Sequence, residues 1–299
     1  MIDITQKTEI LVETLPYMQK FAGKTVVVKY GGNAMVNEDL KRSVIQDIVL
    51  MKCIGIKPIV VHGGGPEITA MLKQLGMKSE FVAGLRVTDE ATATVAQMVL
   101  AGKTNSDIVS MINQFGGRAV GLNGKDSDLI VARKKLATVY ENGEAKEVDI
   151  GFVGDVIKVN ANIIDILLAN DYIPVIAPIG VGLKGETYNI NADYVAGEIA
   201  AAVKATKLML LTDVEGIYRN YPDKDSFIST LSFSEAQEMV RTGSIDGGMI
   251  PKVEACIRAI AGGVEKTHII DGRQPHSLLL EVFTATGIGT EVVSDSGRG

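Results

Sequence analysis

The sequence predicts an α/β protein in which a largely parallel sheet is covered by helices on both faces. From Lys24 onward, short runs rich in aliphatic and β-branched residues alternate with longer stretches of helical periodicity. The runs expected to form strands span 25–29, 58–62, 172–179, 207–212 and 267–270. Such alternation is typical of parallel strands joined by crossover helices. The chain of 299 residues, 46% of them hydrophobic, is long enough to bury a sizeable core.

The segment 1–22, before the first strand, is predicted to form a helical arm. Its apolar residues recur at helical spacing and comprise Ile4, Leu11, Leu15, Met18 and Ala22. Pro16 lies within this stripe, and we expect it to kink the helix because proline lacks an amide donor. The stripe must be covered either by the arm's own domain or by another subunit.

Between about Ala119 and Asn160 the pattern changes to β-type runs separated by turns, which predicts a local β-rich flap with a hairpin tip at 141–143. No low-complexity linker or repeat divides the chain. We therefore expect two lobes, 23–180 and 181–299, that share one continuous sheet with a boundary near Gly180.

Composition limits the classes of ligand and partner. Aromatic residues make up 5% of the chain and its formal net charge is −6, which argues against a nucleic-acid partner. An anionic ligand must then be held by a few placed cations and backbone amides. The two cysteines, Cys53 and Cys256, lie far apart in helical patterns, so we interpret both as core residues in a reducing compartment rather than as a disulfide or metal knuckle. No run is long enough to span a bilayer, and we expect a soluble, cytoplasmic protein.

Two glycine clusters follow adjacent predicted strands. Gly31-Gly32 comes directly after the first strand and Gly63-Gly64-Gly65 after the second. The carboxyl ends of parallel strands are where such sheets bind ligands. Glycine there lets the backbone approach an anion, and amides at a following helix N-terminus favour phosphate. Either cluster alone is more often a structural turn; together they predict an anion site.

The better-known nucleotide and hydrolase signatures are incomplete or absent in this sequence. Gly102-Lys103-Thr104 has the end of a P-loop, but Gln97 replaces its first glycine and the segment lies in a helical pattern. Gly180, Gly182 and Gly185 satisfy G-x-G-x-x-G, yet no helix is predicted to open there, as a dinucleotide fold requires. No H-E-x-x-H, C-x-x-C or G-x-S-x-G occurs.

Four charged side chains are placed to act at this edge of the sheet. Lys29 ends the first strand, and Lys252 opens a helical run after a glycine pair. Two lysines and two sets of amides could serve phosphoryl transfer, which requires mainly alignment and charge neutralisation. Asp193, expected just after a helix cap at Asn191, either favours the helix dipole or bridges both lysines. Arg86 could bind a carboxylate bidentately. No well-placed histidine base is evident, which suits an acceptor that is already an anion.

These residues together resemble acetylglutamate kinase, and the resemblance covers essentially the whole chain. Its motifs occur in the family's order: Lys29-Tyr30-Gly31-Gly32, Val61-His62-Gly63-Gly64-Gly65-Pro66, Leu85-Arg86-Val87-Thr88, Asn189-Ile190-Asn191-Ala192-Asp193, Leu211-Thr212-Asp213-Val214-Glu215-Gly216 and Gly248-Met249-Ile250-Pro251-Lys252. The resemblance implies the amino-acid kinase fold, an open, mainly parallel eight-stranded sheet between helices. It also implies an acyl-amino-acid lobe before the ATP lobe.

Residue roles follow from the resemblance position by position. Lys29 and Lys252 match phosphate-neutralising lysines, and Asp193 matches the aspartate that organises them. Amides of Gly32 and Gly64 would contact the transferring phosphoryl group. The N-acetyl-L-glutamate contacts would be Gly64, Gly65, Arg86 and Asn189. The turn with Thr212, Asp213 and Gly216 would lie beside ATP, whose Mg²⁺ would be held by phosphates and water rather than by a protein metal site.

The resemblance extends to regulation. Arginine-inhibited members carry a kinked N-terminal helix that interlaces three dimers into a hexamer. Their arginine site corresponds here to Tyr17, Lys207, His268, Glu281 and Gly287. We therefore expect a feedback-inhibited hexamer, while binding of a PII-type regulator stays open.

Two other functions remain possible from the residues alone. The acceptor could be a related acyl amino acid such as N-acetyl-aminoadipate, because glycine loops do not report side-chain length. A non-catalytic arginine sensor is the alternative of a different class, and the presence of Lys29, Asp193 and Lys252 together argues against it.

Overall fold

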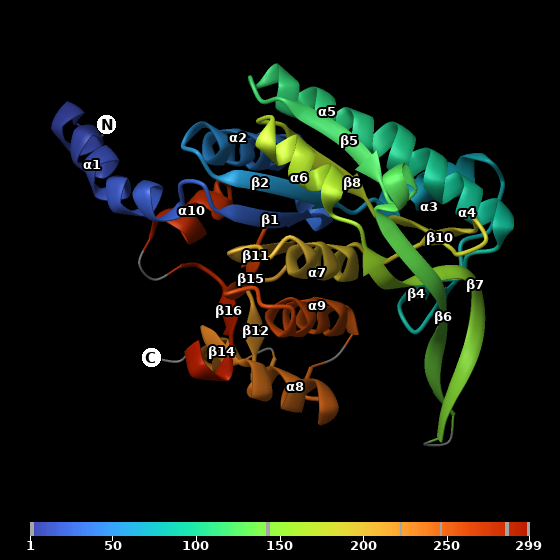
Figure 1. Cartoon of the computed structure of the whole chain (residues 1–299). Coiled ribbons are helices and arrows are strands. Elements are labelled where there is room, and N and C mark those ends of the chain that lie inside the picture. Colours follow the sequence, from blue (N-terminus) through green and yellow to red (C-terminus); the bar gives the residue numbers. More distant parts are fainter. Residues whose placement is uncertain (1–2, 142–143, 222, 246, 285–286, 298–299) are drawn as a thin grey trace.

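A single eight-stranded sheet forms the centre of the molecule. The computed structural model describes residues 3–141, 144–221, 223–245, 247–284 and 287–297. The strands lie in the order β14-β16-β15-β11-β1-β2-β8-β5 (Figure 1). Their bounds are Thr230–Ser232, Thr290–Val293, Lys266–Asp271, Lys207–Thr212, Thr25–Tyr30, Lys57–His62, Ile173–Ala177 and Ala119–Asn123. Six of them are parallel, and β14 and β16 run antiparallel to these. The predicted fold class is confirmed.

The side chains of the central strand β1 point alternately to the two faces of the sheet, and a layer of the core lies on each face. Val27 faces one layer, which contains α6 (Asn162–Ala169), α7 (Ala192–Ala202) and α9 (Ile250–Ala261). Val26 and Val28 face the other. This second layer contains α2 (Glu38–Cys53), α5 (Asn105–Gln114) and α10 (Ser277–Phe283). Because successive strand residues point to opposite faces, a fully apolar strand is expected where helices cover both sides.

Apart from the N-terminal helix, the described residues form four further helical elements, of which α8 packs on α9. They are α3 (Gly65–Gln74), α4 (Glu90–Gln97), a π-helical turn at Met98–Thr104 that joins α4 to α5, and α8 (Phe233–Arg241). Short 3₁₀ turns span Gly32–Met35, Asp126–Asp128, Lys224–Ser226, Gly247–Met249 and Asp295–Gly297. Two small hairpins pair β3 (Phe81–Val82) with β4 (Leu85–Arg86), and β12 (Ile217–Tyr218) with β13 (Phe227–Ile228). None of the described helices is long and apolar enough to cross a bilayer.

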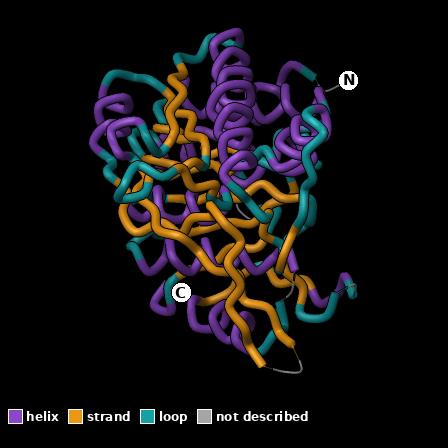
Figure 2. Tube along the Cα trace, turned by 90° about the vertical axis from the view of Figure 1, so that its right-hand side faces the viewer, coloured by secondary structure: helices purple, strands orange, loops and turns teal. Residues whose placement is uncertain are grey.

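The β-rich flap is a long hairpin of β6 (Ile130–Glu141) and β7 (Glu144–Val159) that extends from the body (Figure 2). Its base pairs with β9 (Ile179–Val181) and β10 (Thr187–Asn189). The expected flap began too early, because β5 belongs to the central sheet. The predicted tip residues 142–143 lie outside the described residues.

Two further expectations were wrong in detail. The run 172–179 forms two strands rather than one, because Pro178 separates β8 from β9 and cannot donate to a strand ladder. Cys53 is exposed at the last position of α2, whereas Cys256 is buried as expected. The glycines at 180, 182 and 185 lie in the β9–β10 hairpin, so no helix opens there.

The N-terminal arm is the helix α1 (Ile4–Phe21), which contains Pro16 and stands at the edge of the molecule beside α10 (Figure 1). Its side chains Ile10, Leu11, Val12 and Leu15 are half to two thirds exposed. Strands from before and after Gly180 occupy separate halves of one sheet. The lobe boundary and the separate role of each lobe remain predictions.

Candidate active site

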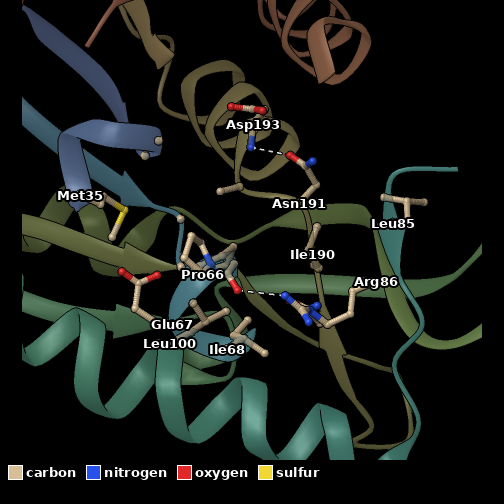
Figure 3. Close-up of a pocket in the computed structure, with 18 of the residues that line it drawn as sticks. Met35, Pro66, Glu67, Ile68, Leu85, Arg86, Leu100, Ile190, Asn191 and Asp193 are labelled. Atoms are coloured by element: carbon tan, nitrogen blue, oxygen red, sulfur yellow. Dashed lines mark hydrogen bonds between the residues drawn. The ribbon is translucent and has the colours of Figure 1, made fainter. Parts of the chain in front are cut away.

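A cavity of about 270 Å³ lies at the carboxyl ends of β1 and β2 (Figure 3). Both glycine clusters line it, as the order of strands predicted. Other lining residues come from β1, α3, the β3–β4 hairpin, the π-helical turn, β10 and the start of α7. They include Lys29, Glu67, Arg86, Leu100, Asn189 and Asp193. The cavity therefore lies where the two halves of the sheet meet.

The backbone of each glycine cluster approaches a neighbour too closely for a side chain. Gly32 has φ +68°, and a Cβ there would lie 2.5 Å from Oδ1 of Asp213. The same oxygen accepts from the amide of Asn33 at 2.6 Å, which ties this loop to the end of β11. At Gly64, φ is +157° and a Cβ would lie 2.4 Å from Cδ2 of Leu100. The positive φ values and this crowding together favour glycine at both positions.

Asp193 joins two lysines from different elements. Lys29, on β1, lies 3.0 Å from its Oδ1, and Lys252, on α9, lies 3.0 Å from its Oδ2. Asn191 caps α7 by accepting from the Asp193 amide at 2.8 Å, which fixes the first turn (Figure 3). Lys29 and Asp193 line the cavity, whereas Lys252 contacts Asp193 without being among the lining residues.

The charge balance at this cluster keeps Asp193 ionised. Burial alone would raise the pKa of Asp193, because water no longer stabilises its charge. The ammonium groups of Lys29 and Lys252 outweigh that effect, so the pKa of the carboxyl lies below its ordinary value. Two cations on one carboxylate leave an excess positive charge, which suits a polyanionic ligand.

Arg86 occupies another side of the cavity (Figure 3). Its Nη2 donates to the carbonyl of Gly65 and to Oγ1 of Thr69, both at 2.9 Å, and its Nη1 donates to Ser79 Oγ. The guanidinium also stacks on Phe81 at 4.7 Å from the ring centroid. Burial lowers the pKa of Arg86 from its ordinary value, but such a group stays charged at neutral pH. These contacts hold a cation in place for an anionic group.

Sequence reasoning missed several residues of this cavity. Glu67, in the first turn of α3, has a buried carboxylate oxygen without a hydrogen-bond partner among the described residues. Its place two residues after Gly65 is a signal that could have found it. Leu100 reaches the cavity from the π-helical turn, and no local sequence pattern predicts that it lies there.

The residues of the turn predicted to lie beside ATP do not all line one cavity. Gly216 lines a second cavity of about 530 Å³, together with Val214, Tyr218, Tyr221 and Met249. Thr212 and Asp213 are not among its lining residues. Asp213 instead accepts from the Asn33 amide and so holds the Gly32–Asn33 loop. Within the described residues, no cluster of three or more His, Cys, Asp or Glu side chains is placed to hold a metal ion.

The five residues matched to an arginine site do gather in one place. A third cavity, of about 470 Å³, is lined by Tyr17 of α1 and by Lys207, His268, Glu281 and Gly287. The buried Glu281 carboxylate lies 2.8 Å from His268 Nδ1 and 3.8 Å from Lys207 Nζ. Burial raises the pKa of Glu281, but the His268 hydrogen bond and neighbouring charges outweigh it, so that pKa lies below its ordinary value. The cavity thus contains buried groups of both signs.

Comparison with known proteins places the chain in a family. A model of the amino acid kinase family matches residues 24–271. Acetylglutamate kinase from Heliobacterium modesticaldum is 60% identical over 294 residues, which cover 98% of this chain and 100% of that protein. Acetylglutamate kinase from Moorella thermoacetica is 58% identical and covers 96% of this chain and 97% of that one.

Solved structures agree on the fold. N-acetylglutamate synthase from Neisseria gonorrhoeae, complexed with coenzyme A and N-acetyl-glutamate, superposes with a TM-score of 0.81 at 27% identity, covering 96% of this chain and 63% of that longer one. Carbamate kinase from Giardia lamblia bound to AMP-PNP gives a TM-score of 0.65 at 19% identity, with 92% and 99% covered, which supports the fold alone. The chain therefore belongs to the amino acid kinase family and, within it, to the family of the acetylglutamate kinases.

Proposed function

We propose that this protein transfers the γ-phosphoryl group of ATP to the side-chain carboxylate of N-acetyl-L-glutamate, a step of arginine biosynthesis. The observation that carries the proposal is the Lys29–Asp193–Lys252 cluster beside two glycine loops at one edge of the sheet. Relatives 58–60% identical over nearly the whole chain are acetylglutamate kinases. In this proposal residues 23–180 form the lobe that binds the acceptor, and residues 181–299 form the lobe that binds ATP. The protein is proposed to act in the cytoplasm.

The chemistry needs no protein nucleophile. An oxygen of the acceptor carboxylate attacks the γ-phosphorus, and the bond from that phosphorus to the β–γ bridging oxygen breaks, so that ADP leaves with the electron pair. A carboxylate is already ionised at neutral pH, so no general base is required. Lys29 and Lys252 neutralise the charge on the phosphoryl group while Asp193 fixes their positions, and amides of Gly32 and Gly64 donate to its oxygens.

The other predicted residues orient the two substrates. The Arg86 guanidinium still has N–H groups that are not used in contacts among the described residues. It is proposed to bind the α-carboxylate of the acceptor, next to Gly65 and Asn189. The cavity with Gly216 is proposed to take the nucleoside beyond the Thr212–Asp213 turn. Mg²⁺ would arrive with ATP, held mainly by phosphate oxygens and water.

The acceptor assignment is tested by trapping the product. Hydroxylamine converts an acyl phosphate into a hydroxamate, and the enzyme with ATP should be offered N-acetylglutamate, N-acetyl-aminoadipate, glutamate and aspartate in parallel. Hydroxamate should form fastest with N-acetylglutamate. Faster trapping with N-acetyl-aminoadipate would move the assignment to that acceptor, and no hydroxamate with any of the four would refute the kinase proposal.

A second proposal concerns regulation. We infer that the third cavity binds arginine, because it places buried Glu281 and Lys207 where a guanidinium and a carboxylate can each find an opposite charge. Tyr17 brings α1 into the same cavity. The exposed apolar face of α1 would dock on another subunit and link three dimers into a hexamer. Binding of a PII-type regulator stays a prediction.

A further inference from the structure

His62 is a buried histidine that the proposed chemistry does not use. It is the last residue of β2 and directly precedes the Gly63-Gly64-Gly65 loop, with 0% of its surface exposed. Its Nδ1 lies 2.7 Å from the carbonyl oxygen of Gly63, and its Nε2 lies 3.1 Å from Nδ2 of Asn105. Asn105 begins α5, is also buried, and lies 2.9 Å through Nδ2 from the carbonyl oxygen of Val175.

This chain of contacts fixes the tautomer of His62. The carbonyl of Val175 can only accept, so the Asn105 atom that faces it must be the amide nitrogen. The same nitrogen also lies 3.5 Å from the carbonyl oxygen of Leu122, but His62 Nε2 is nearer, at 3.1 Å. Because an amide nitrogen only donates, His62 Nε2 must accept. The ring proton therefore resides on Nδ1 and is donated to the Gly63 carbonyl. Burial lowers the pKa of His62 to about 4, so the ring stays neutral at physiological pH.

Anchoring the Gly63 carbonyl determines where the next amide points. In a trans peptide the carbonyl oxygen and the following N–H point in opposite directions. The His62 bond draws the Gly63 oxygen toward the buried side, so the Gly64 N–H faces away from it. Gly64 lines the active-site cavity, and His62 is not among its lining residues. Within the described residues, no protein group accepts from the Gly64 N–H, which leaves it available to a ligand.

Such an anchor is needed because the loop is a run of three glycines. Glycine populates far more backbone conformations than other residues, and a peptide between two glycines can rotate at little cost. Rotation of the 63–64 peptide would turn a carbonyl oxygen, rather than an N–H, toward the phosphoryl group. An electrostatic donor is effective in catalysis only if it is already oriented.

We propose that His62 and Asn105 are positioning residues, which hold the Gly63–Gly64 peptide so that the Gly64 N–H donates to the transferring phosphoryl group. This inference rests on the proposed function. Neither the His62 nor the Asn105 side chain would touch the substrate. Both would act by orienting the Gly63–Gly64 peptide.

The first test separates the hydrogen bond from packing. His62→Asn keeps a donor near the δ position, whereas His62→Phe keeps a ring of similar size without any donor. We expect kcat to fall about 100-fold or more in His62→Phe and much less in His62→Asn, with KM for ATP nearly unchanged. Thermal unfolding of each variant is the control for folding. Equal losses in both variants, or a kcat for His62→Phe within about twofold of wild type, would overturn the proposal.

A second variant disturbs the contact between Asn105 and His62 from a residue that does not line the active-site cavity. Gly121 lies on β5, and a Cβ there would stand 1.9 Å from Oδ1 of Asn105. Gly121→Ala must therefore displace Asn105, and we expect it to lower kcat in the same direction as His62→Phe. This variant keeps the proposal testable if His62→Phe does not fold. A folded Gly121→Ala enzyme with wild-type kcat would count against the positioning role.

A binding measurement distinguishes positioning from general damage. ADP with aluminium fluoride and acceptor mimics the transferring phosphoryl group, whereas ADP alone does not. His62→Phe should weaken binding of the mimic at least about tenfold and leave binding of ADP unchanged; equal weakening of both would overturn the proposal. In the hydroxylamine turnover assay, a wild-type enzyme that makes no acyl phosphate refutes the proposed function, whereas an active wild type matched by His62→Phe refutes only the positioning role.

Discussion

The ammonium group of Lys29 lies 3.0 Å from Oδ1 of Asp193, although Lys29 is on strand β1 and Asp193 is in the first turn of helix α7, far along the chain. Lys252 binds the second oxygen of the same carboxylate. The three side chains therefore lock one another in place, which is the condition for stabilising a phosphoryl group without reorganisation.

The guanidinium of Arg86 is predicted to determine acceptor affinity. Arg86→Lys removes the forked donor set while keeping the charge, so KM for N-acetylglutamate should rise about 10- to 100-fold. KM for ATP should change little. Steady-state kinetics with each substrate varied measures both values. Arg133→Lys, on the exposed hairpin, is the matched control, and an unchanged acceptor KM in Arg86→Lys would contradict the assigned contact.

Removal of the arm is predicted to change assembly. Deletion of residues 1–22 takes away the exposed apolar face of α1 and the Tyr17 side of the third cavity. The truncated protein should form dimers that arginine does not inhibit. Light scattering coupled to size-exclusion chromatography gives the mass. Hexamers that persist after the deletion would refute the proposed role of the arm.

The carboxylate of Glu281 is predicted to be needed for arginine binding but not for assembly. Glu281→Gln keeps the side chain's shape and removes its charge, so arginine affinity should fall about tenfold or more. The variant should remain hexameric and active without arginine. Calorimetric titration with arginine measures the loss, with the exposed Glu265→Gln as control. Wild-type affinity in Glu281→Gln would place arginine elsewhere.

Stability is predicted to fall in mild acid because of His62. The folded protein binds a proton there only near pH 4, whereas an unfolded histidine does so near its ordinary pKa of 6.5. Between these values the unfolded state binds more protons, so the free energy of unfolding decreases as pH falls, by up to about 3 kcal/mol. Urea denaturation at pH 7 and pH 4.5 should show a smaller decrease for His62→Asn than for wild type. Equal decreases would mean that other groups cause the acid sensitivity.

The sequence predicted the parts of this fold that depend on local pattern. The run 207–212 coincides with a strand, because the middle of a buried parallel strand, here 208–211, is apolar at every position. Asn191 is the cap of α7, since its side chain satisfies an otherwise free amide. The glycine clusters could be placed together because carboxyl ends of parallel strands share one edge of the sheet.

The rest depends on contacts between distant segments, which no local pattern reports. The long hairpin pairs at its base with β9 and β10, through Val131 with Val181 and Val153 with Asn189, which are far apart in the chain. The exposure of Cys53 depends on what its helix faces. Two hydrogen bonds join residues far apart in the chain: Asn105 donates to His62, and the Asn33 amide donates to Asp213. These are the features that a single sequence could not reveal.

The central claim is that two ammonium groups held by one carboxylate stabilise the transferring phosphoryl group. The most direct measurement is the single-turnover rate of acyl phosphate formation in Lys29→Ala and Lys252→Ala, with Lys184→Ala on an exposed turn as control. With folding intact by thermal unfolding, each active-site variant should be about 1,000-fold slower or more, and the control unchanged. A folded Lys29→Ala or Lys252→Ala enzyme that transfers the phosphoryl group at nearly the wild-type rate would contradict the claim.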